Sequence, residues 1–430
     1  MAISSIQLLS PAHCSISDAK SSAFPELATV RQIFPILHTN PRTLFFDNAA
    51  TAQKPLPVLE KVEEFNRASC ANAGRGAYSW SRRLSREVEE TRKRVANFLN
   101  SSSELIAFTS GATDSLNMVA TMWGLENLAD GDEVMLCNED HASSVLPWYN
   151  VQELLSRRGV NIKIIPFAVH STGTYDRKSF RAGLGPKTRI VCLSHIHHLY
   201  GMEMDIAELK TLVPEQVFVS LDASQSVSHI KVDAEALAVD FISFSAHKMF
   251  GCNGTGVLWS SPRAVAQMWP TRVGAKTTLS SGSGRFNVAR DKLSQLVECG
   301  TLNLPGILSL KAAIEFIESN GIERMSDYIS GLTIYLLEKL KSVEGIEFAP
   351  GIGVCDCTKG FGIISFRING FDSADIGAYL DSEEIFVKTG DQCLGSGKTD
   401  DDLIRISLQI YNTAQEVDRF LEVLNEAISS

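Results

Sequence analysis

The run FISFSAHKMFGCNGTGVLW, residues 241–259, places three reactive side chains where an apolar segment ends. The segment begins like a buried strand, and Ser245, His247 and Lys248 follow it among several glycines. Most lysines are solvated surface residues. An amine beside a hydroxyl and an imidazole, with glycines that let the backbone approach closely, is instead typical of a ligand site. Both interpretations stay open for Lys248 considered alone.

Asp222 and Gln225 form a second polar pair, directly after the apolar run VFVSLD. A carboxylate at the edge of a core is stabilised by a cationic partner such as a pyridinium. The alternative is a helix N-cap, which is common for Asp after a strand. The spacing in DASQ puts Gln225 on the same turn as Asp222, which favours a ligand site.

A third polar segment, SGATDSLN at residues 110–117, has small residues and hydroxyls just before an expected helix. Backbone N–H groups at such a position bind phosphate, although the same residues also form ordinary turns. Pyridoxal 5'-phosphate requires an amine, a carboxylate for its pyridine nitrogen, and phosphate donors. Taken together, the three segments predict a pyridoxal-phosphate site.

Apolar runs with β propensity alternate with helical patterns through the first three hundred residues. Such alternation predicts a mostly parallel sheet of seven strands with helices on both faces and ligands at the carboxyl ends of the strands. The helical patterns include residues 85–100 and 148–159. The strand candidates are residues 43–50, 104–111, 132–140, 160–167, 188–195, 216–224 and 240–248.

The pattern changes near residue 305, where two long helices are followed by short strands and a closing helix. We therefore expect an α/β protein with a large domain at 44–304 and a smaller α+β domain at 305–430. Residues 1–24 are expected to be a flexible tail, and residues 25–43 a segment that packs with the small domain.

Composition narrows the class of protein. The chain has 430 residues, 44% of them hydrophobic, and a formal net charge of -10. The negative charge argues against nucleic acid or a membrane surface as a partner. The sequence contains no run of about 20 apolar residues, so no membrane span is predicted.

The cysteines and the N-terminus bear on the compartment. Nine thinly spread cysteines suit a reducing compartment, so we expect a cytoplasmic protein. A plastid-type transit peptide is the weaker alternative for the Ser-rich first two dozen residues. Cys355 and Cys357 have no further Cys or His at zinc-ligand spacing, so they are interpreted as structural or incidental and no metal is expected.

From about Val30 to the last helix, the sequence resembles the class V branch of fold-type I pyridoxal-phosphate enzymes, and within it the group II cysteine desulfurases and selenocysteine lyases. The matching motifs occur in the family's order: FFDNAATAQKP, TSGATDSLN, DHASSVLPW, LDASQSV, FSAHKMFGCNGTGVLW, ECGTLN and IRISLQIYNT. The resemblance implies a homodimeric enzyme that acts on an amino acid and contains pyridoxal 5'-phosphate.

Residue by residue, the resemblance implies the following roles. Lys248 would form the aldimine with the cofactor, and His141 would stack on the ring. Asp222 would pair with the pyridine nitrogen, and Gln225 would approach the ring hydroxyl. The phosphate would be bound by Ala112, Thr113, Ser245, His247 and, from the neighbouring subunit, Thr301. The substrate would be bound by the carboxylate-clamping Arg405 together with His198 and Asn48.

Cys393, in VKTGDQCLGSG, stands where the family has its sulfur-accepting cysteine. As a thiolate it would attack the sulfur of a cysteine–cofactor adduct, with Lys248 and His141 moving protons. Several neighbours differ from the family's usual residues, namely Lys388, Asp391, Gln392, His197, His198, Cys252 and Asn253. Asp391 would disfavour the thiolate and Lys388 would favour it.

Three functions are compatible with this sequence. The first is a desulfurase that cleaves the C–S bond of L-cysteine or a derivative, with Cys393 as acceptor and a sulfur-acceptor protein as a possible partner. The second is a C–S β-lyase, epimerase or aminotransferase-like enzyme in which Cys393 is not the acceptor. The third is a non-catalytic binding protein, against which the set Lys248, Asp222, His141 and Arg405 argues.

Overall fold

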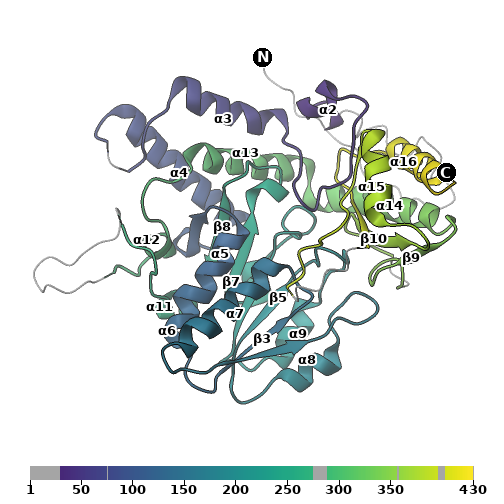
Figure 1. Cartoon of the computed structure of the whole chain (residues 1–430). Coiled ribbons are helices and arrows are strands. Elements are labelled where there is room, and N and C mark those ends of the chain that lie inside the picture. The colour runs from purple at the N-terminus through teal and green to yellow at the C-terminus, as the bar shows by residue number, and fades with distance from the viewer. Residues whose placement is uncertain (1–29, 75, 275–287, 356–357, 396–401, 430) are drawn as a thin grey trace, which may run out of the picture.

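A seven-stranded sheet organises the larger part of the computed structural model, which describes residues 30–74, 76–274, 288–355, 358–395 and 402–429 (Figure 1). The strand order is β2-β8-β7-β6-β5-β3-β4, and β8 runs antiparallel to the other six strands. The mostly parallel α/β sheet expected from the sequence is therefore confirmed. The strands are β2 (Ile106–Thr109), β3 (Glu133–Cys137), β4 (Lys163–Phe167), β5 (Thr188–Ser194), β6 (Phe218–Asp222), β7 (Phe241–Ser245) and β8 (Gly256–Ser260).

One of the seven strands is not the one that the sequence suggested. The run at residues 43–50 contributes only β1 (Leu44–Phe45), which pairs in parallel with β11 (Ile385–Phe386) outside the large sheet. The missing strand is β8, which runs antiparallel between β7 and β2 and follows the lysine loop, the residues from Lys248 to Thr255. We predicted no strand at these residues because glycines precede them, although Val257, Leu258 and Trp259 are all buried.

Alternate residues of the central strands enter different cores. Along β3, Val134 and Leu136 belong to one buried cluster, whereas Met135 and Cys137 belong to the other. Successive strand residues point to opposite faces, so helices must cover both sides of the sheet. The covering helices of this part are α3 (Leu56–Ala68), α4 (Ser79–Phe98), α5 (Ala112–Met118), the π-helix η3 (Val119–Gly124), α6 (Leu125–Asn127), α7 (Ala142–Ser156), α8 (Arg177–Gly183), α9 (Ile206–Leu212), α10 (Ala234–Leu237), α11 (Pro262–Gln267) and α12 (Leu293–Val297).

Helix α13 (Leu304–Asn320) lies with the large sheet rather than with the C-terminal elements. It packs along α3 and α4, as Figure 1 also shows. We had expected the small domain to begin at residue 305, but the apolar residues of α13 are buried against those helices. The change of packing occurs one helix later, at α14 (Ile322–Leu340).

The C-terminal elements form a second, smaller layer. Strands β9 (Ile346–Phe348), β10 (Ile363–Ile368) and β12 (Ile404–Ser407) make an antiparallel sheet in the order β12-β10-β9. The accompanying helices are α14, α15 (Ser373–Ser382) and α16 (Ala414–Ser429). Asp356, Cys357 and the expected tail at residues 1–24 lie outside the described residues. Cys355 is disulfide-bonded, so its interpretation as incidental is not supported.

The N-terminal segment, which includes α2 (Pro35–Thr39), is anchored on these C-terminal elements. Arg31 pairs with Glu416 of α16 at 2.6 Å, and the Phe34 ring lies 4.6 Å from that of Tyr411. Phe34 also packs against Phe250. The N-terminal segment thus joins both layers of the molecule.

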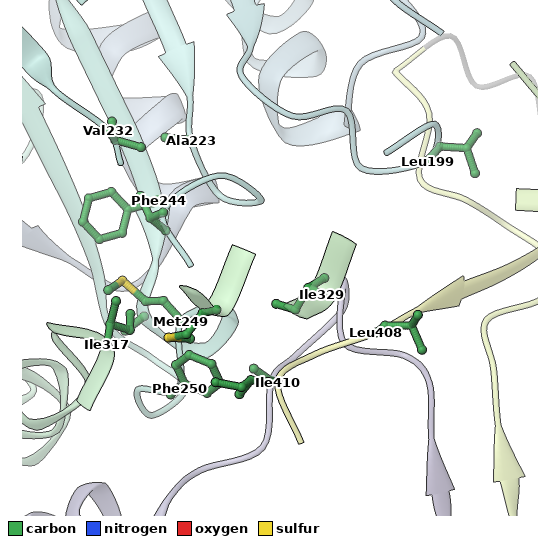
Figure 2. Close-up of a cluster of buried hydrophobic side chains, with 14 of the residues drawn as sticks. Leu199, Ala223, Val232, Phe244, Met249, Phe250, Ile317, Ile329, Leu408 and Ile410 are labelled. Atoms are coloured by element: carbon green, nitrogen blue, oxygen red, sulfur yellow. The ribbon is translucent and has the colours of Figure 1, made fainter. Parts of the chain in front are cut away.

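The lysine loop is anchored in the same core. Met249 and Phe250 directly follow Lys248 and have no exposed surface. Figure 2 shows them beside Ile317 of α13 and Ile410. Phe250 has a φ of +69°, which is costly for an aromatic residue and persists only where packing enforces it. Apolar contacts after Lys248 therefore fix the position of its backbone.

Among the described residues, no helix is both long and apolar enough to cross a membrane.

Replacing Phe34 with Ala should reduce the free energy of unfolding by about 3–5 kcal/mol, since it removes a fully buried ring from a core with little room to relax. Ile36→Ala, at an exposed position of α2, is the control and should change it by about 0.5 kcal/mol or less. Urea unfolding measures both. Equal effects would show that the segment is not docked as described.

Candidate active site

Five strands of the large sheet end at one edge and place their following residues around a cavity of about 340 Å³. This volume suits a small cofactor with a small substrate. Ligands bind at this edge because the carboxyl ends of parallel strands meet there. The cavity is lined by Asp47, Ala49, Ala50, Ala112, Thr113, His141, Ser143, Ser194, Ile196, His198, Asp222, Ser224, Gln225, Ser245, His247, Lys248, Lys388, Gln392, Cys393 and Arg405.

Lys248 is the last residue of the short helix η4 (Ala246–Lys248) after β7, and it lines the cavity. Burial lowers its pKa, Asp222 opposes this shift, and Arg405 adds to it. A lowered pKa increases the fraction of neutral amine, which is the nucleophilic form. The amine predicted from the sequence is therefore placed where it can react with a bound aldehyde.

Asp222 ends β6, and its carboxylate is held by hydroxyl and backbone donors. Oδ2 accepts from Ser144 Oγ at 3.0 Å, and Oδ1 accepts from the backbone N of Ser224 at 2.9 Å. These neutral donors come from α7 and from the turn after β6. They hold the carboxylate at the cavity wall without neutralising its negative charge. That charge can therefore pair with a cationic group of a ligand.

His141 is the N-cap of α7, and its Nδ1 accepts from the backbone N of Ser143 at 3.1 Å. Its ring stands edge-on to His198 at 5.0 Å. Burial, together with the nearby Lys248, lowers the pKa of His141 to about 4. At neutral pH the ring is therefore uncharged, which suits both stacking on a planar ligand and accepting a proton.

The cavity end beside α5 carries the predicted phosphate-binding residues. The backbone N of Ala112 donates to Ser245 Oγ at 2.7 Å, and the hydroxyls of Thr113 and Ser143 lie 2.7 Å apart. His247 also lines the cavity, and burial lowers its pKa to about 4. A Cβ at Gly256 would come within 2.5 Å of the Gly111 backbone, so β8 and the loop before α5 touch directly.

The two remaining residues predicted to bind the cofactor are Gln225, which lines the cavity, and Thr301, which does not. Gln225 is buried at the cavity, where its Nε2 donates to the carbonyl of Ala49 at 2.9 Å. Thr301 is exposed and does not line the cavity of its own chain. The predicted role of Thr301 requires a second copy of the chain.

Arg405, on β12, brings the C-terminal sheet to the cavity. It donates to Asp47 Oδ1 at 3.0 Å and to the carbonyl of His198 at 3.2 Å. Its Nε is buried without a partner. Arg405 is thus a cavity residue and not an exposed strand position.

Asn48 was predicted to bind substrate, but it does not line the cavity. Its Nδ2 donates to the carbonyl of Ser407 at 2.6 Å and to Asn412, and its Oδ1 accepts from Tyr411. These contacts tie the first turn after β1 to the C-terminal elements. The neighbouring Asp47, which forms a bridge with Ser407 of β12, lines the cavity instead.

Cys393 lines the cavity and is also exposed to solvent. Its backbone N donates to Asp391 Oδ1 at 2.7 Å, and its carbonyl accepts from Ala142 N at 2.8 Å. His198 Nε2 lies 2.9 Å from the carbonyl of Gln392, whose side chain is buried. These contacts hold the cysteine segment against the start of α7.

This donor set fits pyridoxal 5'-phosphate. A buried amine, a fixed carboxylate and a neutral imidazole surround one cavity, and hydroxyls and a backbone N–H lie at one end of it. Lys248 would hold the aldehyde, Asp222 the pyridine nitrogen, and Ala112, Thr113, Ser245 and His247 the phosphate. Within the described part of the chain, no cluster of three or more side chains is suited to a metal ion.

Comparison with known proteins agrees with this geometry. The model of the aminotransferase class-V family matches residues 44–420. The chain belongs to this family. A cysteine desulfurase of Salmonella agona (strain SL483) is 32% identical over 400 residues, which cover 91% of this chain and 96% of that protein. Family membership confirms the predicted fold type and the pyridoxal-phosphate cofactor.

Solved structures of cysteine desulfurases have the same architecture. The apo enzyme of Thermococcus onnurineus NA1 superposes with a TM-score of 0.84 at 27% identity, covering 94% of this chain and 98% of that one. The cysteine desulfurase CsdA of Escherichia coli, in an S-sulfonic acid form, superposes with a TM-score of 0.82 at 26% identity and the same coverage.

Sequence reasoning assigned no role to several residues in or near the cavity. Asp47 lines the cavity and accepts from Arg405, and Ser144 donates to Asp222. The available signals were the position of Asp47 directly after an apolar run and the position of Ser144 in the first turn of a helix. Asp140, the buried residue before His141, was also missed. It accepts from the Tyr175 hydroxyl at 2.7 Å.

Asp140 should make stability depend on pH. Burial raises its pKa from 3.8 to about 7, against the opposing effect of hydrogen bonds from Tyr175 and Ser194. Between these two values the folded protein binds more protons than the unfolded chain, so the contribution of Asp140 to stability falls as pH rises. Relative to wild type, Asp140→Asn should therefore gain stability from pH 4 to pH 7, on the order of 4 kcal/mol.

Urea unfolding of both holoproteins across this range measures the difference. If the free energies of unfolding of wild type and Asp140→Asn changed equally with pH, the buried position of Asp140 would be contradicted.

Proposed function

We propose that this protein is a pyridoxal-phosphate-dependent cysteine desulfurase that cleaves the C–S bond of L-cysteine or a close derivative. The supporting observation is the position of Cys393, which shares a cavity with Lys248 and Arg405 and is also open to solvent. A thiol in this position can receive sulfur from a substrate bound in the cavity and make that sulfur accessible to an acceptor in solvent. In the net reaction, the sulfur of cysteine passes to the Cys393 thiol, giving alanine and an enzyme persulfide.

The residues around the ring support this chemistry through protons and charge. Bound pyridoxal phosphate supplies an electron sink for the substrate Cα. Asp222, held by Ser144 and Ser224, keeps a proton on the pyridine nitrogen. His141 is neutral near pH 7 and lies within the same cavity as Lys248, so these two residues accept and return protons.

Arg405 orients the substrate through its carboxylate. In the structure, the guanidinium of Arg405 pairs with the carboxylate of Asp47. When the substrate binds, its carboxylate replaces that of Asp47 as the partner of Arg405. Lys388 lines the same wall and adds positive charge. His198 closes the wall behind the substrate, because its ring packs between His141 and His197.

Function in a cell requires further partners. We infer a homodimer in which Thr301, exposed on each subunit, completes the phosphate site of the other. The exposed Cys393 suits a second protein as sulfur acceptor, and the cytoplasm is the compartment that the free cysteines favour.

The alternative that the sequence also allows is a C–S β-lyase in which Cys393 is not the acceptor. A lyase would release pyruvate, ammonia and sulfide from cysteine without the help of this thiol.

Replacing Cys393 with Ala should abolish alanine and sulfide formation from L-cysteine in the presence of a reductant, by at least about 100-fold, because the sulfur acceptor is lost. Cys70→Ala removes another exposed free cysteine and serves as the control, with activity expected at the wild-type level. Alanine, sulfide and pyruvate are quantified together. Pyruvate formation that persists in Cys393→Ala would establish the lyase.

Replacing Lys248 with Ala should remove the yellow absorbance of the purified holoprotein, because Lys248 is the amine that we propose binds the cofactor aldehyde covalently. Lys388→Ala is the matched control, since Lys388 lines the same cavity. It should retain the absorbance. Loss of the band in Lys388→Ala, with retention in Lys248→Ala, would reverse the assignment.

A further inference from the structure

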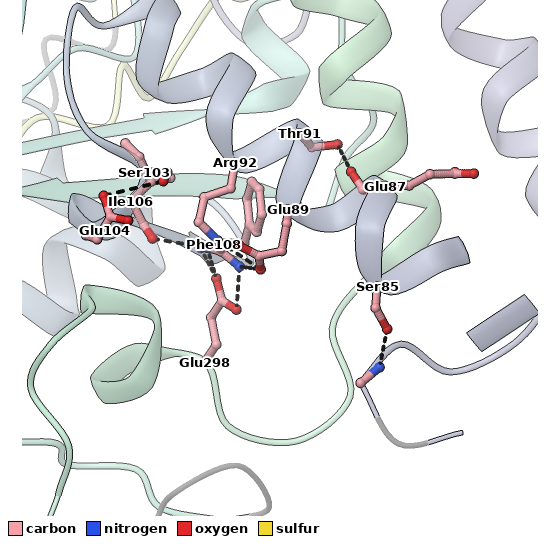
Figure 3. A network of polar contacts seen from close by, with 11 residues as sticks. Ser85, Glu87, Glu89, Thr91, Arg92, Ser103, Glu104, Ile106, Phe108 and Glu298 are labelled. Carbon is pink, nitrogen blue, oxygen red and sulfur yellow. Dashed lines mark hydrogen bonds and ion pairs between the residues drawn. The ribbon is translucent and has the colours of Figure 1, made fainter. Parts of the chain in front are cut away.

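Strand β2 is the edge strand of the large sheet, but the free side of its backbone is not open. In place of a neighbouring strand it meets an ion pair between Arg92 of α4 and Glu298, which follows α12 (Figure 3). Glu298 Oε1 accepts from the backbone N of Phe108 at 2.8 Å, and Arg92 Nη1 donates to the carbonyl of Ile106 at 3.0 Å. The two side chains therefore satisfy the groups that a further strand would bind.

The ion pair has a defined geometry. Arg92 Nη1 and Nη2 lie 2.6 and 3.1 Å from the two carboxylate oxygens of Glu298. The guanidinium also stands 4.7 Å above the Phe108 ring. Arg92 is 2% exposed and Glu298 is 6% exposed. Two oppositely charged planar groups thus clamp the edge of β2 from a single side.

Stability alone does not account for this arrangement. Withdrawing two charges from water costs free energy that their attraction barely recovers, and a well-packed apolar pair commonly stabilises a protein at least as well. A bidentate ion pair differs from an apolar pair in fixing position and direction. The residues that follow β2 are those proposed to bind the cofactor phosphate, and their binding depends on their position.

Strand β2 leads directly into Ser110 and Gly111 and then into α5, the proposed phosphate-binding segment. The segment after Glu298 turns back to the other side of that loop. Asn303 Nδ2 donates to the carbonyl of Gly254 at 2.8 Å, just before Gly256 meets Gly111. Residues 298–303 are therefore bonded at one end to β2 and at the other to the start of β8.

We propose that Arg92 and Glu298 are positioning residues for the cofactor phosphate: they fix the end of β2 so that the loop from Ser110 to Thr113 presents its donors at the correct place. Neither side chain lines the cavity or touches the ligand. This inference rests on the proposed function at one point, namely that the cofactor phosphate binds at the loop from Ser110 to Thr113.

The test compares two probes that differ only in the phosphate group, pyridoxal 5'-phosphate and pyridoxal. Glu298→Gln keeps the size of the side chain and removes the charge. It should raise the Kd for pyridoxal 5'-phosphate about tenfold, measured by reconstituting the full-length protein after removal of its cofactor, which is the effect of one weakened charge-assisted hydrogen bond. Its Kd for pyridoxal should stay within about twofold of wild type, since the amine and the ring contacts are intact.

Glu89→Gln is the matched control. Glu89 also contacts Arg92, at 3.3 Å, but it is exposed and does not touch β2. Both Kd values should therefore stay at the wild-type level. A purely structural role of the Arg92–Glu298 pair would weaken both probes equally in Glu298→Gln and would overturn the proposal.

A double variant, Arg92→Met with Glu298→Leu, covers the case in which Glu298→Gln leaves a buried charge and fails to fold. Both charges are then absent, so the double variant buries no unpaired charge, while the edge of β2 still loses its two partners. Weaker binding of pyridoxal 5'-phosphate alone supports the proposal, and wild-type binding of it refutes the proposal. If wild type itself binds both probes equally, the phosphate site of the proposed function fails instead.

Discussion

Burial of one amine next to one carboxylate at the end of a parallel sheet is the constraint on which the rest of this structure depends. Lys248 has its pKa lowered by burial, while Asp222 opposes that shift from the end of the next strand. The amine stays reactive only if the cavity remains partly dry and the carboxylate stays in place. The packing of Met249 and Phe250 and the hydroxyl donors to Asp222 meet these two requirements.

Much of this could be predicted from residue types and their order. Apolar runs followed by Lys248, Asp222 or His141 identified strand ends, and ligands gather at such ends in parallel sheets. The errors have local causes. Strand β8 was not predicted because glycines precede it, and α13 was assigned to the small domain because sequence does not show which neighbour buries an apolar helix.

Contacts between segments distant in sequence were beyond reach of the sequence. The choice between Asp47 and Asn48 depends on how the residues after β1 pack on β12, and the role of Glu298 depends on Arg92 of α4, 206 residues away. Cys393 was recognised by its motif, but its fixation by Ala142 is a tertiary feature. The cysteine segment is thus tied to the residue that follows His141, which couples the proposed sulfur-accepting position to the proposed ring-stacking position.

In the proposed reaction, sulfur passes from a bound cysteine to Cys393. Mass spectrometry of the Cys393 peptide after one turnover with L-cysteine, without reductant, detects this transfer. The peptide is expected to gain the mass of one sulfur atom while one equivalent of alanine appears. An unmodified Cys393 peptide from a protein that has already released sulfide and pyruvate would contradict it.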